Sequence, residues 1–344
     1  MTDNIAELTR GFASDNYSGV HPEVLAALAE ANVGHTTSYG DDPWTGRLGT
    51  LATRLFGDDA QIYPVFNGTG ANVISLQSVL PRWGAVIAPR TAHINCDEGG
   101  APEKVGAIKI LGVDTPDGKL TPDLAAAEAW GWGDPHRSQP LAISISQVSE
   151  LGTCYTPEEV RALADFAHSN GMALHVDGSR LSNAAAHLGA TFRELTTDAG
   201  VDVLSLGGTK IGAMGAEAVV VLNPQVATGV DYLRKTNMAL GSKMRFISTQ
   251  LLALYEGDLA LRSARHANEM GARLGNELLG VVPIPYPVES NVVFAKLNAE
   301  QKHRARSRFR FYDWPGDPEL VRLMCSFDTT EDDVLTLAGL IRGE

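Results

Sequence analysis

Apolar residues follow two alternating patterns along the chain, and this alternation predicts the fold class. Short apolar runs, typical of buried strands, occur at 60–66, 85–88, 106–111, 141–146, 172–177 and 203–206. Segments with apolar residues every three or four positions, typical of amphipathic helices, lie at 22–32, 71–80, 122–130 and 157–170, and another ends near residue 56. Strands that alternate with helices predict an α/β protein with a mostly parallel sheet.

The pattern changes after residue 219. Two helical segments, 243–256 and 258–279, precede a proline-rich stretch that breaks regular structure at 283–287. Beyond it the sequence predicts strands near 292–297, 309–312 and 320–326 and a last helix over 330–342. We therefore expect a large domain over residues 1–250 and a smaller α+β domain over 251–344.

The run at 203–206 ends in Gly-Gly-Thr and then presents Lys210. A lysine held near an apolar surface has a lowered pKa, and its amine can then attack a carbonyl to form a Schiff base. Taken alone, an ordinary exposed loop lysine is the more common case.

A second turn, Asn67-Gly-Thr-Gly, joins the strand at 60–66 to the helix at 71–80. Backbone N–H groups at such a helix start, with the Thr69 hydroxyl beside them, can hold an anion of phosphate size. The spacing matches neither a Walker loop nor the three-glycine dinucleotide motif. A plain tight turn is the alternative.

Asp177 ends the strand at 172–177, and a carboxylate buried there requires a partner. Arg180 would make the pair structural, whereas a protonated pyridine nitrogen would make it part of a site. Three features together are those that hold pyridoxal 5'-phosphate: a helix start that can bind phosphate, an aspartate at a strand end and a lysine in a turn. Further polar candidates are His93 and Glu98, past the strand at 85–88, and Arg322, whose fork suits a carboxylate.

Composition and net charge indicate which binding partners and which cellular compartment to expect. The net charge of −13 argues against nucleic acid or an anionic membrane as a partner. Three cysteines, at 96, 154 and 325, have no metal-type spacing, so we expect no metal site and a reducing cytoplasm. Residues 1–12 lack the pattern of a signal peptide, and no apolar run is long enough to span a membrane.

The ordered motifs resemble the low-specificity L-threonine aldolases, pyridoxal-phosphate enzymes of fold type I related to the β-eliminating lyases. The resemblance extends over nearly the whole chain and is carried by Ser-Asp-Asn-Tyr, Tyr-Gly-Asp-Asp-Pro-Trp-Thr, Gly-Thr-Gly-Ala-Asn, His93 with Glu98, His-Val-Asp-Gly-Ser-Arg, Gly-Gly-Thr-Lys and Val-Arg-Leu-Met-Cys-Ser. It implies a large domain with a mostly parallel seven-stranded sheet flanked by helices, and a smaller C-terminal α+β domain.

The resemblance also implies roles for individual residues. Lys210 would bind the cofactor as a Schiff base, Asp177 would pair with the pyridine nitrogen, and His93 would stack on the ring and move the β-hydroxyl proton. The resemblance places further residues in three groups: Gly68, Thr69 and Gly70 on the phosphate; Ser14, Arg180 and Arg322 on the substrate carboxylate, with Arg180 also near the phenolic oxygen; and Tyr39 and Arg245 in the neighbouring subunit's site. A homodimer or homotetramer follows.

Two departures mark a distinct subgroup. Many relatives carry Asn-Thr-His after the strand that here ends at Ser146, so a second active-site histidine is missing, and Ser149 or Glu150 lies there instead. The Gly-Gly-Thr-Lys turn also differs from the Ser-Lys-Gly form of part of the family.

The leading hypothesis is reversible retro-aldol cleavage of L-threonine, L-allo-threonine or a related L-β-hydroxy-α-amino acid to glycine and an aldehyde. One alternative is a phenylserine-type aldolase for bulky β-substituents. Another is β-elimination or transamination on the same cofactor, and a binding protein for small anions comes last.

Overall fold

The larger of two sheets organises the molecule. The computed structural model describes residues 10–344. The expectation that residues 1–12 are not a signal peptide falls mostly on residues 1–9, outside this range. The seven strands are ordered β1-β7-β6-β5-β4-β2-β3. Only β7 runs antiparallel to its neighbours β1 and β6, so the prediction of a mostly parallel sheet is confirmed. The strands are β1 (Gln61–Val65), β2 (Gly84–Pro89), β3 (Lys109–Val113), β4 (Gln139–Ser146), β5 (Ala173–Gly178), β6 (Val203–Leu206) and β7 (Glu217–Val221).

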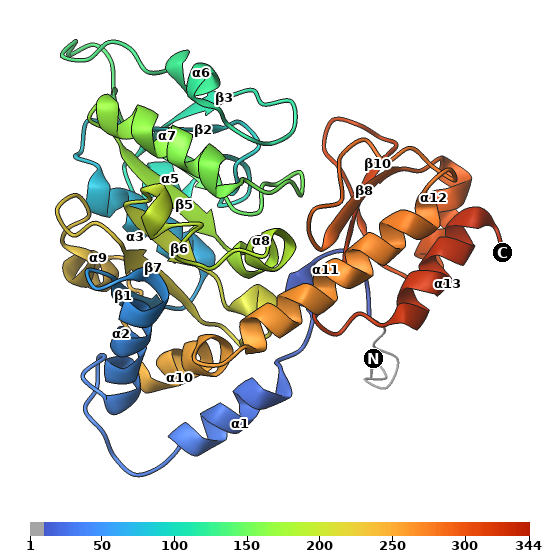
Figure 1. Ribbon diagram of the computed structural model, residues 1–344, viewed down its shortest axis with the longest axis horizontal. Coiled ribbons are helices and arrows are strands. Elements are labelled where there is room, and N and C mark those ends of the chain that lie inside the picture. Colours follow the sequence, from blue (N-terminus) through green and yellow to red (C-terminus); the bar gives the residue numbers. More distant parts are fainter. Residues whose placement is uncertain (1–9) are drawn as a thin grey trace.

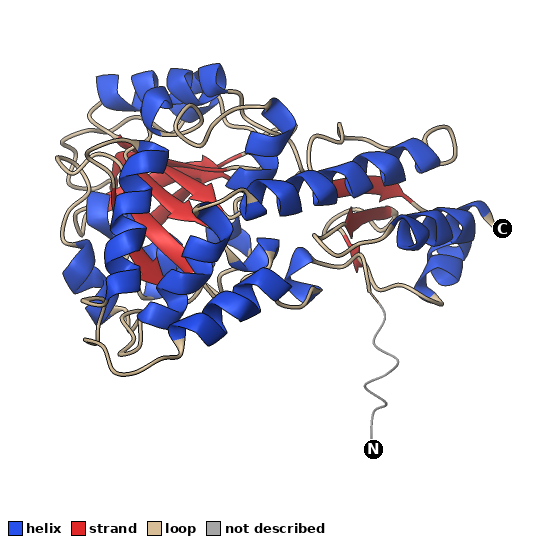
Figure 2. Ribbon diagram, turned by 60° about the horizontal axis from the view of Figure 1, so that its bottom comes forward, coloured by secondary structure: helices blue, strands red, loops and turns tan. Residues whose placement is uncertain are grey.

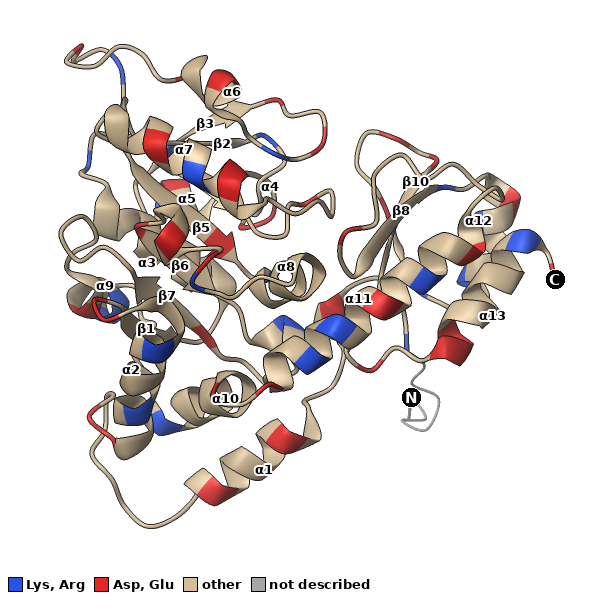
Figure 3. Ribbon diagram, viewed as in Figure 1, with Lys and Arg blue, Asp and Glu red and all other residues tan. Residues whose placement is uncertain are grey.

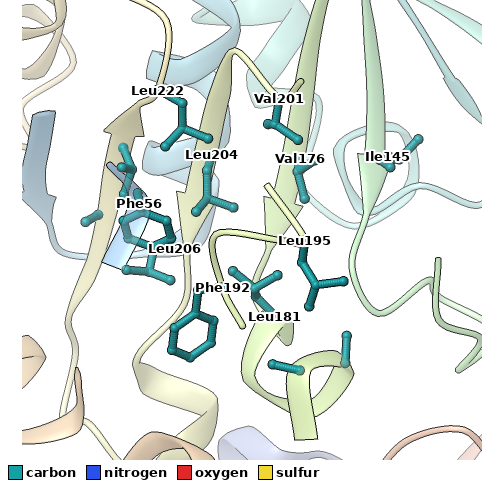
Figure 4. Packing of buried hydrophobic residues seen from close by; sticks show 14 of the residues in the cluster. Phe56, Ile145, Val176, Leu181, Phe192, Leu195, Val201, Leu204, Leu206 and Leu222 are labelled. Atoms are coloured by element: carbon teal, nitrogen blue, oxygen red, sulfur yellow. The ribbon is translucent and has the colours of Figure 1, made fainter. Parts of the chain in front are cut away.

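Helices cover both faces of this sheet (Figure 2). On one face Ala71 and Ile74 of α3 pack on Val203 and Val219. On the other face Leu204 and Leu206 meet Phe56 and Leu181 (Figure 4). The strand β6 thus alternates between two apolar layers, as a strand covered on both sides must. The helices of this domain are α1 (Pro22–Ala31), α2 (Pro43–Phe56), α3 (Gly68–Val79), α4 (His93–Cys96), α5 (Ala101–Lys104), α6 (Pro122–Ala126), α7 (Pro157–Ser169), α8 (Leu181–Leu188), α9 (Val230–Thr236) and α10 (Arg245–Tyr255).

A second, smaller body lies beside the first and is reached along the long helix α11 (Figure 1). Its three-stranded sheet has the order β8-β10-β9, and its own apolar core includes Phe309, Leu323 and Leu337. Its elements are α11 (Leu259–Leu278), β8 (Val292–Lys296), α12 (Ala299–Arg306), β9 (Tyr312–Asp313), β10 (Leu320–Met324) and α13 (Glu331–Arg342). Residue 250 lies inside α10, and the predicted domain boundary there stays a prediction.

Three predicted element limits are wrong, each for a local reason. The strand expected from 106 begins at Lys109, because Gly106 and Ile108 still donate to carbonyls of α5. The helix expected to 130 ends at Ala126, because the N–H groups of Ala127, Glu128 and Ala129 bond to carbonyls three residues back rather than four. The strand expected at 309–312 is displaced to β9, because Phe309 closes the last turn of α12 through its N–H to Ala305.

Lys and Arg residues are interspersed with Asp and Glu residues along the helices (Figure 3). Within residues 10–344, no helix combines the length and apolarity needed to cross a bilayer. The same residues contain no group of three His, Cys, Asp or Glu side chains arranged to hold a metal ion.

Candidate active site

A pocket of about 650 Å³ lies between the two bodies, where β4 and β5 end opposite β10. Both bodies contribute to its walls, for example Asp177 from the large sheet and Arg322 from the small one. Parallel strands place their carboxyl ends at one edge, and sites form there. Six of the predicted site residues line this pocket: Ser14, His93, Asp177, Arg180, Lys210 and Arg322.

Lys210 stands in a single 3₁₀ turn, Thr209–Ile211, directly after β6. The two preceding glycines are required by space: a Cβ on Gly207 would lie 2.6 Å from the Ser179 carbonyl oxygen, and one on Gly208 2.4 Å from that of Ala216. The buried Glu217 of β7 accepts the Gly208 N–H at 2.8 Å. The turn is therefore held by backbone contacts that no residue with a side chain at these positions could make.

The side chain of Lys210 is half-buried at the pocket wall, and desolvation together with the positive charge of Arg180 lowers the pKa of its amine. Asp15, Asp177 and Glu217 oppose this shift without reversing it. A lowered pKa increases the neutral, nucleophilic fraction of the amine. The sequence-based expectation of a reactive lysine thus has a physical basis here.

Asp177 lies on the same side of β5 as α3 and is 5% exposed. It accepts hydrogen bonds from Asn72 Nδ2 at 2.9 Å and from Ser179 Oγ at 2.6 Å. Burial alone would raise its pKa, but Lys210, Ser179 and Asn72 hold the pKa below its usual value. Arg180 is not its ion-pair partner, so the structural alternative of an Asp177–Arg180 pair is wrong.

Arg180 instead makes a bidentate ion pair with Asp15, in which Nε donates to Oδ2 at 2.7 Å and Nη2 donates to Oδ1 at 2.9 Å. The side chain of Asp15 is 2% exposed and that of Arg180 16% exposed, so each charge would be costly without the other. Arg322 enters the pocket from β10, where burial and the charge of Arg180 lower its pKa.

His93 opens α4 and belongs to a chain of hydrogen bonds that ends at Asp177. Its Nδ1 lies 2.9 Å from Glu98 Oε1, and the same oxygen accepts from Asn72 Nδ2 at 2.8 Å. The bond to Glu98 is the main reason that the pKa of His93 is raised, against the effect of burial. Because Nδ1 faces Glu98, the other ring nitrogen is left for a ligand.

The Gly-Thr-Gly segment, predicted as a turn before a helix at 71–80, itself forms the first turn of α3. Asn67 caps the helix by accepting the Gly70 N–H at 2.7 Å. The N–H groups of Gly68 and Thr69 precede this bond and cannot bond within the helix. A Cβ on Gly68 would lie 3.8 Å from Ser179 Oγ, so this helix end adjoins the pocket wall.

Tyr39 and Arg245 do not line this pocket. Tyr39 is 50% exposed with a positive φ of 60°, and Arg245 Nη1 donates to the Val33 carbonyl at 2.9 Å. Their predicted place in a neighbouring subunit's site stays a prediction.

Where the second histidine is missing, Ser149 and Glu150 both line the pocket. Ser149 Oγ is engaged by Thr153 Oγ1 at 2.6 Å. Glu150 Oε1 accepts the His93 backbone N–H at 2.9 Å and the Ser146 hydroxyl at 2.6 Å. Glu150 therefore supports the backbone of His93.

Sequence reasoning missed three supporting residues: Asp15, Asn72 and Glu217. Asp15 passes for an ordinary loop cap, and its pairing with Arg180 spans 165 positions. The signal for the other two was a polar residue within an otherwise apolar helix or strand. With these three residues the site contains a half-buried amine, a strand-end carboxylate of lowered pKa and two guanidinium groups. These groups fit an anionic aldehyde cofactor with a cationic ring nitrogen.

Together the fold and the pocket define an α/β enzyme with a half-buried lysine in its pocket. The chain belongs to the beta-eliminating lyase family, whose family model matches residues 11–300.

Individual relatives agree with this assignment. The chain is 42% identical to the low specificity L-threonine aldolase of Pseudomonas aeruginosa over 347 aligned residues, which cover 99% of each chain. It is 31% identical to the enzyme of that name from Escherichia coli K12, over 58% of this chain and 60% of that one. Among solved structures, a threonine aldolase from Leishmania major superposes with a TM-score of 0.90 at 27% identity, covering 97% and 99% of the two chains.

Proposed function

We propose that the protein is a pyridoxal 5'-phosphate-dependent aldolase that reversibly cleaves L-threonine, L-allo-threonine or related L-β-hydroxy-α-amino acids to glycine and an aldehyde. The names of its relatives support the reaction, since the P. aeruginosa protein matches over its whole length. The observation that carries the proposal is that Lys210, half-buried and with a lowered amine pKa, lines one pocket with Asp177.

The cofactor's contacts follow from the residues present. Lys210 would hold its aldehyde carbon, Asp177 its ring nitrogen, and Gly68 and Thr69, with Gly70 beside them, its phosphate. Asp177 stays charged because its pKa is lowered, and a charged carboxylate keeps a pyridine nitrogen protonated. When bound, the cofactor supplies an electron sink for the Cα–Cβ bond.

The chain's own residues bind the substrate and move its proton. Arg322, Arg180 and Ser14 provide positive charge and a hydroxyl for the carboxylate. His93, whose side chain is 40% exposed toward the pocket and oriented by Glu98, accepts the proton of the β-hydroxyl. A base so placed contributes on the order of 10² to 10⁴ in rate.

Assembly and compartment belong to the same proposal. We place the protein in the cytoplasm as a homodimer or homotetramer, with Tyr39 and Arg245 completing a neighbour's site. Both residues lie away from their own pocket, which supports a role across an interface. Residues 1–250 and 251–344 would be its two domains.

Borohydride reduction followed by peptide mass mapping tests the cofactor. We expect a pyridoxyl adduct on Lys210 and none on Lys119, a half-buried lysine that is engaged by Glu159 at 2.6 Å. A reconstituted, folded sample without an adduct on Lys210 would end the proposal.

Product analysis on unreduced protein tests the reaction. We expect glycine and acetaldehyde from L-threonine, and L-phenylserine in parallel reports the size of the accepted β-substituent. Ammonia with a keto acid, or amino transfer without glycine, would instead show elimination or transamination. His93→Ala that retains turnover within about threefold of the unaltered protein would remove His93 as the base.

A further inference from the structure

The N-terminal segment from Phe12 to Asp15 connects the two bodies at the pocket. Phe12 is held by the small body on both sides, with its N–H donating to the Arg310 carbonyl at 2.8 Å and its carbonyl accepting from the Met324 N–H at 2.9 Å. Three residues later Asp15, 1% exposed, binds Arg180 of the large body. The short segment from Phe12 to Asp15 therefore links the small body to Arg180 of the large body.

The two pocket arginines differ in the donors that they have left. Arg180 commits Nε and Nη2 to Asp15, and Nη2 also contacts Met324 Sδ at 3.2 Å. Only Nη1 is without a partner among residues 10–344. A bidentate grip on a carboxylate needs two nitrogens on one side of the guanidinium, so Arg180 no longer offers one.

Arg322, in contrast, has most of its hydrogen-bond donors unused within the described residues. Its Nη2 makes one long bond of 3.3 Å to the Ala13 carbonyl, and its buried Nε has no hydrogen-bond partner in the described part of the chain. A buried guanidinium with unused donors is costly until an anion reaches it. Arg322 also lacks a carboxylate within ion-pair distance among these residues, whereas Arg180 has Asp15.

We infer that Asp15 is a positioning residue that holds the Nε and Nη2 edge of Arg180 against the N-terminal segment, so that Arg322 grips the substrate carboxylate with two nitrogens while Arg180 reaches it through Nη1 alone. The inference rests on the proposed function, because it assigns donors within that site. Two further observations agree with it. Asn291 Nδ2 donates to Asp15 Oδ2 at 3.2 Å and fixes the carboxylate from the small body. The pKa of Asp15 is lowered by Arg180 despite burial, so the pair is charged at neutral pH.

A double-mutant cycle on the reconstituted enzyme tests whether Asp15 acts through Arg180. We expect Asp15→Asn to lower kcat for L-threonine at least about tenfold while KM stays within about threefold. In the Arg180→Gln background the same change should lower kcat less than about twofold, because its target is gone. Additive losses in kcat would show that Asp15 does not work through Arg180 and would overturn the inference.

Glycine affinity, followed by absorbance of the loaded enzyme, tests the division between the arginines. Arg322→Gln should raise the Kd of glycine roughly 10- to 100-fold, as expected for lost charge-assisted bonds. Asp15→Asn/Arg180→Gln should raise it less than about threefold. Equal losses in both proteins would mean that Arg180 holds the carboxylate as firmly as Arg322, contrary to the inference.

Unfolding of the cofactor-free protein in urea separates positioning from folding. Asp15→Asn leaves a buried guanidinium unpaired and should lower the midpoint, and Asp15→Asn/Arg180→Gln should restore it at least halfway without restoring kcat. If Asp15→Asn does not fold, the kcat and glycine comparisons are made between Arg180→Gln and the neutral double variant, where a further kcat loss above about twofold counts against the inference.

Asp333→Asn is the matched control, because Asp333 pairs with Arg10 at 2.6 Å outside the pocket. It should cost stability and leave kcat within about twofold. Glycine binding does not need carbon–carbon cleavage. A wild-type protein that binds glycine but does not cleave L-threonine would therefore refute the proposed function while the glycine comparison still decides between the arginines.

Discussion

Asn72 is the residue whose replacement should most clearly separate the support of the site from its reacting groups. It is 1% exposed, and its single amide nitrogen donates to both Glu98 Oε1 at 2.8 Å and Asp177 Oδ2 at 2.9 Å. Asn72→Leu keeps a similar volume and removes both donors from buried carboxylates. A hydrogen bond to a charged group contributes about 1.5–3 kcal/mol, so two such bonds correspond to roughly 3–6 kcal/mol of unfolding free energy.

The assay is urea unfolding of the cofactor-free protein, followed by titration with pyridoxal 5'-phosphate. The unfolding free energy should fall by the amount above. Cofactor affinity should fall as well, because loss of a donor raises the pKa of Asp177 and weakens its hold on a cationic nitrogen.

Asn237→Leu is the control, since its amide donates to the neutral acceptors Gln77 Oε1 at 2.7 Å and the Leu233 carbonyl at 2.8 Å. It should cost roughly 1–3 kcal/mol and leave cofactor affinity unchanged. An Asn72→Leu protein whose stability lies within about 0.5 kcal/mol of wild type, with unaltered cofactor affinity, would refute this account of the buried carboxylates.

Three further predictions concern pH. Burial lowers the pKa of His175 to about 4, so protonating this histidine destabilises the folded state. Its contribution to stability is full above the unfolded pKa near 6.5, and the unfolding free energy should fall by roughly 2–3 kcal/mol between pH 7 and 4.5. In urea unfolding, His175→Gln should remove this pH dependence. Burial raises the pKa of Glu150, so the contribution of this residue to folding stability is lost as pH rises from its unfolded toward its folded pKa. The stability of Glu150→Gln should therefore increase relative to wild type between pH 4 and 8. The absence of such a relative gain would contradict this reasoning. Because Glu98 is the main cause of the raised pKa of His93, Glu98→Gln should shift the acid limb of the kcat profile to lower pH, and an unmoved limb would show that His93 does not govern it.

The sequence by itself determined the α/β class and the order of the chemical groups along it. Periodicity is a local property, and the run Val203–Leu206 is recovered as β6 with the same limits. Asp177 was found because it stands at the end of one apolar strand, and Lys210 because it stands in the turn after the next; strand ends meet at one edge of a parallel sheet. Arg322 was found as a charge within an apolar strand.

The sequence alone could not decide how the charged groups pair, because pairing depends on which side chains the fold brings together. It left Asp177 with two possible partners and indicated no partner for Asp15. The tertiary structure decided both, since Asp15 and Arg180 meet across 165 positions and Asn72 reaches from α3 to Asp177. Local patterns determine elements, while the low dielectric of the interior makes each buried charge depend on neighbours that are distant in sequence.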